Sequence, residues 1–139
     1  MRYLLISHGP FAKAAVESLQ MIMGECSNVD ALSVMLDSTI QSTVEEINSV
    51  VDSHSEDQFV IVTDIRGGTP FNASYRVLKE KGNCVLISGF NLPLLLDLLL
   101  LPSDSLEAVI ERVEKQFPKT LTIVQDGLQT HDSIDDFDL

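Results

Sequence analysis

Short apolar runs that alternate with helical segments constrain the fold of this chain more than any other feature of its sequence. Four runs have the length and the apolar character of buried strands, and they cover residues 3–6, 31–36, 59–62 and 84–87. Helical patterns over 11–23, 40–51 and about 70–81 separate them. This alternation predicts a three-layer α/β/α fold with a mostly parallel sheet and right-handed crossovers.

The last third of the chain adds two helices and a short strand to this pattern. The helices are predicted over 92–101 and 103–116, the second capped by Ser103, and an apolar run over 121–124 is predicted to be the strand. Residues 126–139 carry five aspartates and few apolar side chains, which is typical of an acidic C-terminal tail. The sequence thus predicts one domain over 1–125 followed by a tail over 126–139.

The charge balance excludes several classes of partner. Nine Lys and Arg against 21 Asp and Glu give a formal net charge of −12, which repels nucleic-acid phosphates and anionic lipids. The most apolar segment, 92–101, is interrupted by Pro93 and Asp97 and is too short to span a bilayer as a helix. The N-terminus has no signal-peptide core before His8. We therefore expect a cytoplasmic protein that binds no nucleic acid and does not insert into a membrane.

Two polar residues end predicted strands that would be neighbours in a sheet of order 2-1-3-4. His8 ends the first strand and Asp64 follows the third, and ligands in open α/β sheets lie beyond such carboxyl ends. A carboxylate on one ring nitrogen fixes the histidine tautomer and leaves the other nitrogen as a nucleophile near neutral pH. The pair therefore predicts a phosphoryl acceptor, with His8 and Asp64 as its catalytic residues.

The loop after Asp64 predicts a binding site for the phosphoryl group. Gly67, Gly68 and Thr69 lead into a helix for which Thr69 is the predicted N-cap and Pro70 the first residue. Free backbone N–H groups and the helix dipole favour an anion there. We count Ser7 among the residues predicted to bind the phosphoryl group, through a hydrogen bond near His8; the alternative is that Ser7 simply ends its strand. The loop lacks the lysine of a P-loop and the spaced glycines of a dinucleotide fingerprint, so no nucleotide is expected.

Three blocks of residues, in this order, resemble a known family. They are Ser7-His8-Gly9, then Thr63-Asp64 with Gly67-Gly68-Thr69-Pro70-Phe71-Asn72, and then Gly89-Phe90-Asn91-Leu92-Pro93. Together they are similar to the IIA component of mannose-family sugar phosphotransferase systems, the family of mannose, fructose and sorbose uptake. The resemblance covers the chain from residue 1 to about residue 124.

The resemblance implies a phosphotransferase component that works through a phosphohistidine intermediate. It implies that the phosphocarrier protein HPr phosphorylates His8 and that a IIB component accepts the group, with no metal or cofactor. Asp64 would orient His8, and the loop from Gly67 to Thr69 would help to hold the phosphoryl group. The resemblance also implies a homodimer in which the strand over 121–124 crosses to the partner's sheet, and an association with the membrane components IIC and IID through IIB.

The chain departs from the family pattern at Arg66, where a bulky apolar residue is frequent. We predict that Arg66 contacts a partner or the phosphoryl group, and that Phe71, Asn72 and Asn91 are further partner contacts. The acidic tail matches no part of the family. No IIB sequence follows in the chain, so we expect the IIB acceptor to be a separate protein.

Two other functions are compatible with the same residues. The first is the phosphoryl donor subunit of a dihydroxyacetone kinase, which has a similar fold. The second is a regulatory module that keeps the fold and has no catalytic activity. The sequence leaves the transported sugar open, because a IIA component meets proteins and not the sugar.

Overall fold

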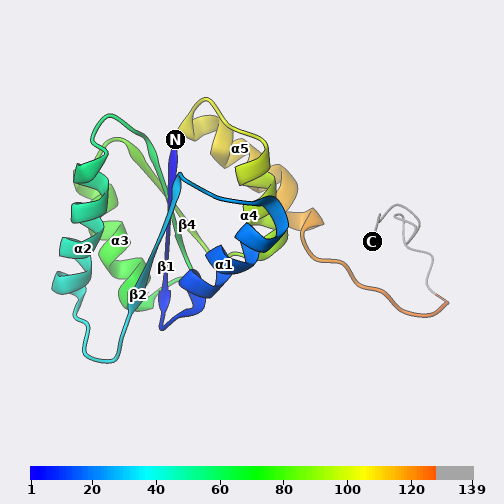
Figure 1. The fold of residues 1–139 in the computed structure, drawn as a ribbon, viewed down its shortest axis with the longest axis horizontal. Helices are drawn as coiled ribbons and strands as arrows, with labels where there is room; N and C mark the ends of the chain where they lie inside the picture. The colour runs from blue at the N-terminus through cyan, green and yellow to red at the C-terminus, as the bar shows by residue number, and fades with distance from the viewer. Residues whose placement is uncertain (128–139) are drawn as a thin grey trace.

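The computed structural model describes residues 1–127, which form a three-layer α/β/α arrangement around a four-stranded sheet (Figure 1). The strands are β1 (Arg2–His8), β2 (Val29–Val34), β3 (Phe59–Thr63) and β4 (Cys84–Ser88). They pair in parallel in the order β2-β1-β3-β4. The predicted fold class and strand order are therefore confirmed.

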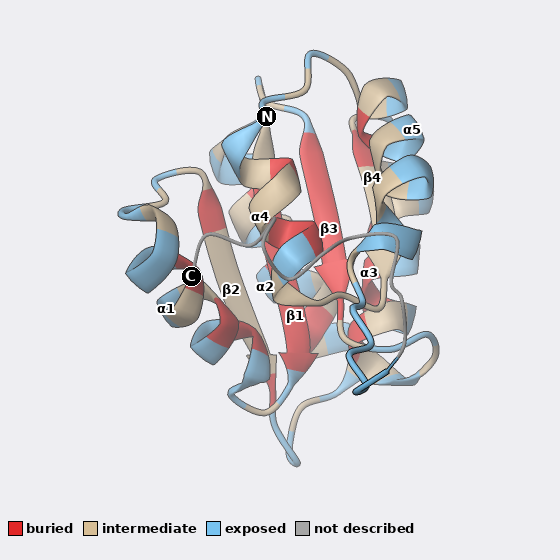
Figure 2. Ribbon diagram, turned by 90° about the vertical axis from the view of Figure 1, so that its right-hand side faces the viewer, coloured by how far each residue is buried: buried red, intermediate tan, exposed pale blue. Residues whose placement is uncertain are grey.

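The two central strands form the core of the domain. Every residue of β3 is buried, and so are Tyr3 to Ser7 of β1 (Figure 2). Parallel strands with helices on both faces need such continuous apolar runs, because neither side of the strand meets water. Leu5 lies opposite Ala31 of β2 and Val62 of β3. This register brings the carboxyl ends of the central strands to one edge of the sheet.

Helices cover both faces of the sheet. They are α1 (Phe11–Met23), α2 (Ile40–Ser53), α3 (Gly68–Glu80), α4 (Leu92–Leu100) and α5 (Leu106–Gln116), followed by a 3-10 turn, η1 (Phe117–Lys119). Helices α2 and α3 bury Ile47 and Val77 on one face, while α1, α4 and α5 bury Leu19, Leu95 and Val109 on the other (Figure 1). Among residues 1–127, none of the helices has the length and apolarity needed to cross a membrane.

Strand β2 begins and ends two residues earlier than the sequence predicts. Its last residue is Val34, so Met35 and Leu36 belong to the following turn. The Met35 N–H donates to Ser38 Oγ at 2.9 Å, and the Ser38 N–H donates to the Met35 carbonyl at 3.0 Å. A serine side chain thus closes the turn before two apolar residues that the pattern alone assigns to the strand.

Helix α5 begins later than predicted, and its cap is Ser105 rather than Ser103. The Ser105 side chain accepts a hydrogen bond from the Ala108 N–H at 3.1 Å, the spacing that an N-cap requires. Ser103 lies further upstream, and its hydroxyl is 3.4 Å from the Arg112 guanidinium. The loop contains two serines, so the sequence does not decide which of them caps the helix. Ser105 is the cap because its side chain meets the N–H of Ala108 in the first turn of α5.

Helix α3 begins at Gly68 with Gly67 as its N-cap, so the prediction that Thr69 is the cap was wrong. Gly67 and Gly68 have φ angles of +82° and +79°, in the left-handed region that glycine alone adopts without strain. This conformation lets the chain turn sharply from β3 into the helix. Pro70 lies in the first turn, where a missing N–H leaves no hydrogen bond unmade.

Residues 121–124 do not form the predicted strand within the chain itself. The segment after η1 leads away from the body of the domain (Figure 1), and Leu121, Ile123 and Val124 are exposed. A strand needs a neighbouring strand with which it can form hydrogen bonds, and this segment has none among the described residues. Its exchange between two copies remains a prediction. Of the predicted acidic tail over 126–139, residues 128–139 lie outside the described residues.

Candidate functional site

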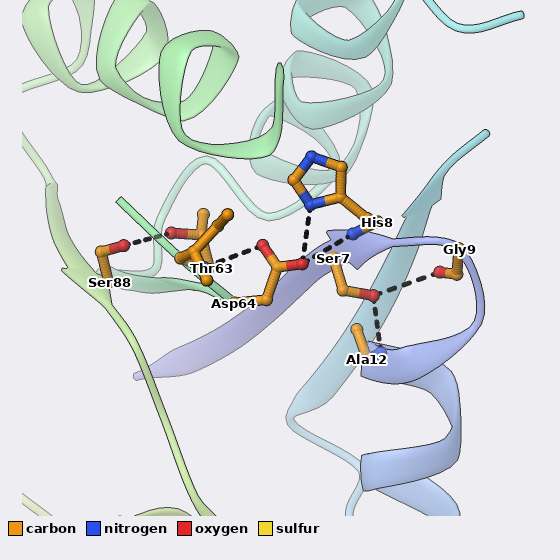
Figure 3. A network of polar contacts seen from close by, with 8 residues as sticks. Ser7, His8, Gly9, Ala12, Thr63, Asp64 and Ser88 are labelled. Carbon is orange, nitrogen blue, oxygen red and sulfur yellow. Dashed lines mark hydrogen bonds and ion pairs between the residues drawn. The ribbon is translucent and has the colours of Figure 1, made fainter. Parts of the chain in front are cut away.

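His8 and Asp64 meet at the carboxyl edge of the sheet. His8 is the last residue of β1, and Asp64 directly follows the neighbouring strand β3. Asp64 Oδ2 lies 2.8 Å from His8 Nδ1 and 2.9 Å from the His8 backbone nitrogen (Figure 3). One carboxylate oxygen therefore holds both the ring and the backbone of His8. The contact that the sequence predicts between the two residues is present.

The Asp64 carboxylate accepts three hydrogen bonds from the described residues, because its Oδ1 also accepts one from the Ile65 N–H at 2.9 Å. Partial burial raises the pKa of this carboxyl group, but the hydrogen bonds from His8 and Ile65 outweigh burial and bring the pKa below its ordinary value of 3.8. Because the folded-state pKa is lowered, the ionised group contributes stability above the ordinary pKa. That contribution is lost as the pH falls through the lowered value.

The other edge of the imidazole is open to solvent. The His8 side chain is 50% exposed, whereas that of Asp64 is 11% exposed. A carboxylate at Nδ1 places the ring proton there, so Nε2 of the neutral ring keeps its lone pair. None of the described residues donates a hydrogen bond to Nε2. The ring projects from the end of β1, away from the Ser7 hydroxyl (Figure 3).

The start of α3 lies against this open edge. A Cβ atom at Gly68 would be only 3.1 Å from both Cε1 and Nε2 of His8. The first N–H groups of a helix have no acceptor within the helix and lie at the positive end of its dipole. Gly68 and Thr69 hold such positions, and Thr69 lines a pocket of about 390 Å³ together with His8. The site thus offers backbone donors to an anion close to Nε2.

A buried threonine holds the strand end from which Asp64 extends. Thr63 is fully buried, and its hydroxyl donates to Ser88 Oγ of β4 at 3.1 Å (Figure 3). The Thr63 carbonyl accepts from the Gly89 N–H at 2.8 Å. Sequence reasoning noted Thr63 only as part of a motif. Its structural role is to tie β3 to β4 immediately before the carboxylate.

Ser7 lies under the His8 turn and not beside Nε2. It is fully buried, its Oγ accepts from the Ala12 N–H at 2.7 Å, and its hydroxyl donates to the Gly9 carbonyl at 3.1 Å (Figure 3). These two bonds close the turn between β1 and α1. A part for Ser7 in binding the phosphoryl group stays a prediction, and its observed role is to close the turn that carries His8.

Removing this hydroxyl is expected to destabilise the domain. The Ser7→Ala variant leaves the buried Ala12 N–H without a partner, which should lower the free energy of unfolding by about 1–3 kcal/mol. Chemical denaturation monitored by circular dichroism measures the change. The matched control is Ser33→Ala, because Ser33 lies opposite Ser7 on β2 and forms no side-chain hydrogen bond with the described residues. Equal losses in both variants would contradict the role given to Ser7.

Three of the four predicted partner contacts lie near the start of α3. Arg66 and Asn72 are exposed. Phe71 is half-buried and stacks on Tyr75, with ring centroids 6.2 Å apart. These three residues have surface available to a partner, so their role as contacts remains a prediction.

Asn91, the fourth predicted contact, is already engaged within the fold. Its Oδ1 accepts from the Leu94 N–H at 2.9 Å and caps α4. Its amide group donates to Thr120 Oγ1 at 2.8 Å. Both polar ends of the side chain are therefore used, one in starting α4 and the other in holding the residue that follows η1. This arrangement favours a structural role for Asn91.

Sequence reasoning missed the apolar turn beside His8. Met35, Leu36 and Ser38 line the same pocket as His8 and Thr69. The signal that could have found them is the serine three residues after Met35, a spacing that suits a side-chain-closed turn. The sequence pattern places Met35 and Leu36 in the preceding strand because both residues are apolar.

Comparison with known families shows to which class of protein this fold and this His–Asp site belong. A family model described as EIIA-man, PTS system fructose IIA component, matches residues 2–114. The chain belongs to this family: it is a IIA component of a mannose-family sugar phosphotransferase system.

Individual relatives agree with this assignment. The chain is 28% identical to the sorbose-specific EIIA component of Lacticaseibacillus casei over 99% of this chain and 100% of that one. It is 34% identical to the fructose-specific EIIA component of Bacillus subtilis (strain 168) over 70% of this chain and 68% of that one. The mannose/sorbose-specific IIA subunit from Enterococcus faecalis has the same fold, with a TM-score of 0.84 at 19% identity over 93% of this chain and 98% of that one.

Proposed function

We propose that this chain carries a phosphoryl group on Nε2 of His8, accepting it from phosphorylated HPr and passing it to a IIB component. The 2.8 Å contact between Asp64 Oδ2 and His8 Nδ1 carries the proposal, because it leaves Nε2 as the lone-pair nitrogen at an exposed edge. Membership of the IIA family supports sugar uptake over donation to a dihydroxyacetone kinase.

Transfer to His8 is a displacement at phosphorus. The Nε2 lone pair forms the new N–P bond while the bond from phosphorus to the donor nitrogen breaks, and the donor keeps that electron pair. The Nδ1 proton stays on His8, so the phosphorylated ring gains positive charge. The Asp64 carboxylate stabilises this charge through the Nδ1–H bond. In transfer to IIB, a nucleophile of IIB forms a new bond to phosphorus while the N–P bond breaks, and its electron pair returns to Nε2 of His8.

The start of α3 provides a place for the phosphoryl oxygens. Backbone N–H groups of Gly68 and Thr69 stand at the end of the helix that faces the open edge of the ring. Their partial positive charge offsets the negative charge on the oxygens. No base is required at Nε2, because that nitrogen carries no proton to remove.

We propose further that the chain acts as a homodimer, and that IIB links it to the membrane components IIC and IID. Among the described residues, β4 is an edge strand whose outer side pairs with no other strand, and the exposed side chains of Leu121, Ile123 and Val124 suit a strand added there from a second copy. Sedimentation should give a dimer for the full chain and a monomer when residues 121–139 are removed. A full chain that stays monomeric would refute the exchange.

Substituting Gly68 by alanine is expected to slow phosphorylation of His8 by roughly tenfold or more, because the new methyl group displaces the ring from its attacking position. The matched control is Gly24→Ala. Gly24 ends α1 away from the site, has a similar positive φ of +86°, and a Cβ there meets nothing within 4 Å. Both variants should lose about 1–3 kcal/mol of stability from backbone strain. Phosphorylation rates from phospho-HPr measure the difference, and equal rates in the two variants would contradict the placement of Gly68.

Intact-protein mass spectrometry tests the proposed function. The full chain is incubated with phosphoenolpyruvate, enzyme I and HPr, and a IIB protein is then added. We expect one acid-labile phosphoryl group on the chain, which leaves when IIB is present. A chain that acquires no group from phospho-HPr would refute the carrier function and favour a regulatory module.

A further inference from the structure

An apolar turn stands exposed beside His8. Leu36 is as exposed as in an extended chain, at 109%, and Met35 is 54% exposed. The turn joins β2 to α2 at the same edge of the sheet as the His–Asp pair (Figure 1). Large apolar side chains that are this exposed stay in contact with water until another molecule covers them, so their exposure favours a binding surface.

The turn is held in one conformation by its own hydrogen bonds. Met35 and Ser38 exchange two of them, one through the serine side chain. The start of the turn is also anchored to the site, because the Val34 carbonyl accepts from the Gly9 N–H at 2.8 Å. A preformed turn loses little conformational entropy when a partner binds, which favours its use as a contact.

Met35 and Leu36 share a pocket with the reactive histidine. His8, Gly9 and Thr69 form the remainder of its wall, together with Val34 and Ser38. A protein that brings a phosphorus atom to bonding distance of Nε2 has to cover this pocket. The turn and His8 would therefore be buried by the same partner in one event.

Two further exposed apolar residues belong to the chain segments that form the site. Phe11 starts α1 three residues after His8 and is 52% exposed, and Ile65 directly follows Asp64 and is 58% exposed. Exposed apolar side chains thus extend from three of the segments that form the site, in a chain whose net charge is −12. A partner that fits it carries its phosphorylated side chain within an apolar rim.

We propose that Met35 and Leu36 form the apolar docking point for the protein that donates the phosphoryl group to His8. The inference rests on the proposed function and adds which surface the donor recognises. Leu36, the more exposed of the two residues, supplies the larger part of this contact. Binding of the donor depends on this contact, and the chemistry at Nε2 does not.

Two phosphoryl donors of different size separate docking from chemistry. Phospho-HPr is the protein donor, and phosphoramidate is a small donor that needs no docking surface. The variants are Leu36→Ser, Met35→Ser and the double substitution. The control is Met21→Ser, because Met21 is 89% exposed and lies ten residues beyond Phe11 on α1, about 15 Å along the helix. Thermal melting of each variant checks the fold.

We expect Leu36→Ser to lower kcat/KM for phospho-HPr roughly tenfold, mostly through KM, with a larger loss in the double variant. Phosphorylation by phosphoramidate should stay unchanged in every variant, and Met21→Ser should match the wild type with both donors. Unchanged phospho-HPr kinetics in the double variant would overturn the docking role, and so would equal losses with both donors. A wild type that neither donor phosphorylates would refute the proposed function itself.

Discussion

Replacing His8 by alanine is expected to abolish phosphorylation of the chain and to leave its fold intact. His8 supplies the reacting nitrogen, and the variant has no imidazole beside Asp64 at the end of β1. Its side chain is half exposed, so little apolar burial is lost. The backbone N–H of His8 keeps its bond to Asp64 in the variant. The free energy of unfolding should change by no more than about 1 kcal/mol, while intact-mass analysis should show no phosphoryl group.

His54→Ala is the matched control for this substitution. His54 ends α2, away from the site, and its ring meets Phe59 edge-on with centroids 6.4 Å apart. Removing it should cost some stability and leave phosphorylation at the wild-type level. Phosphorylation that persists in His8→Ala, or disappears in His54→Ala, would contradict the assignment of His8.

Replacing Asp64 by asparagine is expected to slow phosphorylation by roughly 10²- to 10⁴-fold, because the ring loses both its orientation and its counter-charge. The carboxylate accepts three N–H groups through two oxygens, whereas an amide has one oxygen. With the amide oxygen toward His8, the amide NH₂ opposes the Ile65 N–H. In the flipped orientation the NH₂ opposes the His8 N–H and favours the tautomer that protonates Nε2. Stopped-flow transfer from phospho-HPr measures the rate.

The Asp64 variant also tests the pH dependence of stability. Wild type should lose the contribution of the ionised Asp64 as the pH falls below 3.8 and through the lowered pKa. Asp64→Asn should lack this part of the acid transition. Asp104→Asn, at an exposed loop position, is the charge-matched control and should keep wild-type rates. Transfer at the wild-type rate in Asp64→Asn would show that His8 needs no orienting carboxylate.

The sequence predicts the central sheet and the His–Asp pair because both follow from burial. A strand covered on two faces has to be apolar throughout, and the runs in β1 and β3 meet that requirement. A polar residue directly after such a run comes out at the carboxyl edge. With β1 and β3 adjacent, His8 and Asp64 have to lie near each other.

The details that the sequence misplaces depend on single hydrogen bonds or backbone angles. A serine hydroxyl ends β2 before Met35, and two glycines in the left-handed region start α3 ahead of Thr69. The hydrogen bonds of Ser7 depend on how the turn between β1 and α1 folds over it. Apolar periodicity carries none of this information, because it reports which face is buried and not which local bond closes a turn.

The strand predicted over 121–124 is absent from the described chain for another reason. Its apolar residues favour a strand, and the described chain provides no ladder for it. A sequence reports the tendency of a segment to pair but not whether its partner lies in the same chain. The exposure of Leu121, Ile123 and Val124 is what leads us to propose a second copy as that partner.

The most direct test of the account is to determine which nitrogen of His8 carries the phosphoryl group. The chain, labelled with ¹⁵N at histidine, is phosphorylated through phosphoenolpyruvate, enzyme I and HPr, and long-range ¹H–¹⁵N spectra are recorded at neutral pH. We predict phosphorus on Nε2 of His8, with the proton retained on Nδ1 beside Asp64. Phosphorus on Nδ1, or on any residue other than His8, would contradict the account.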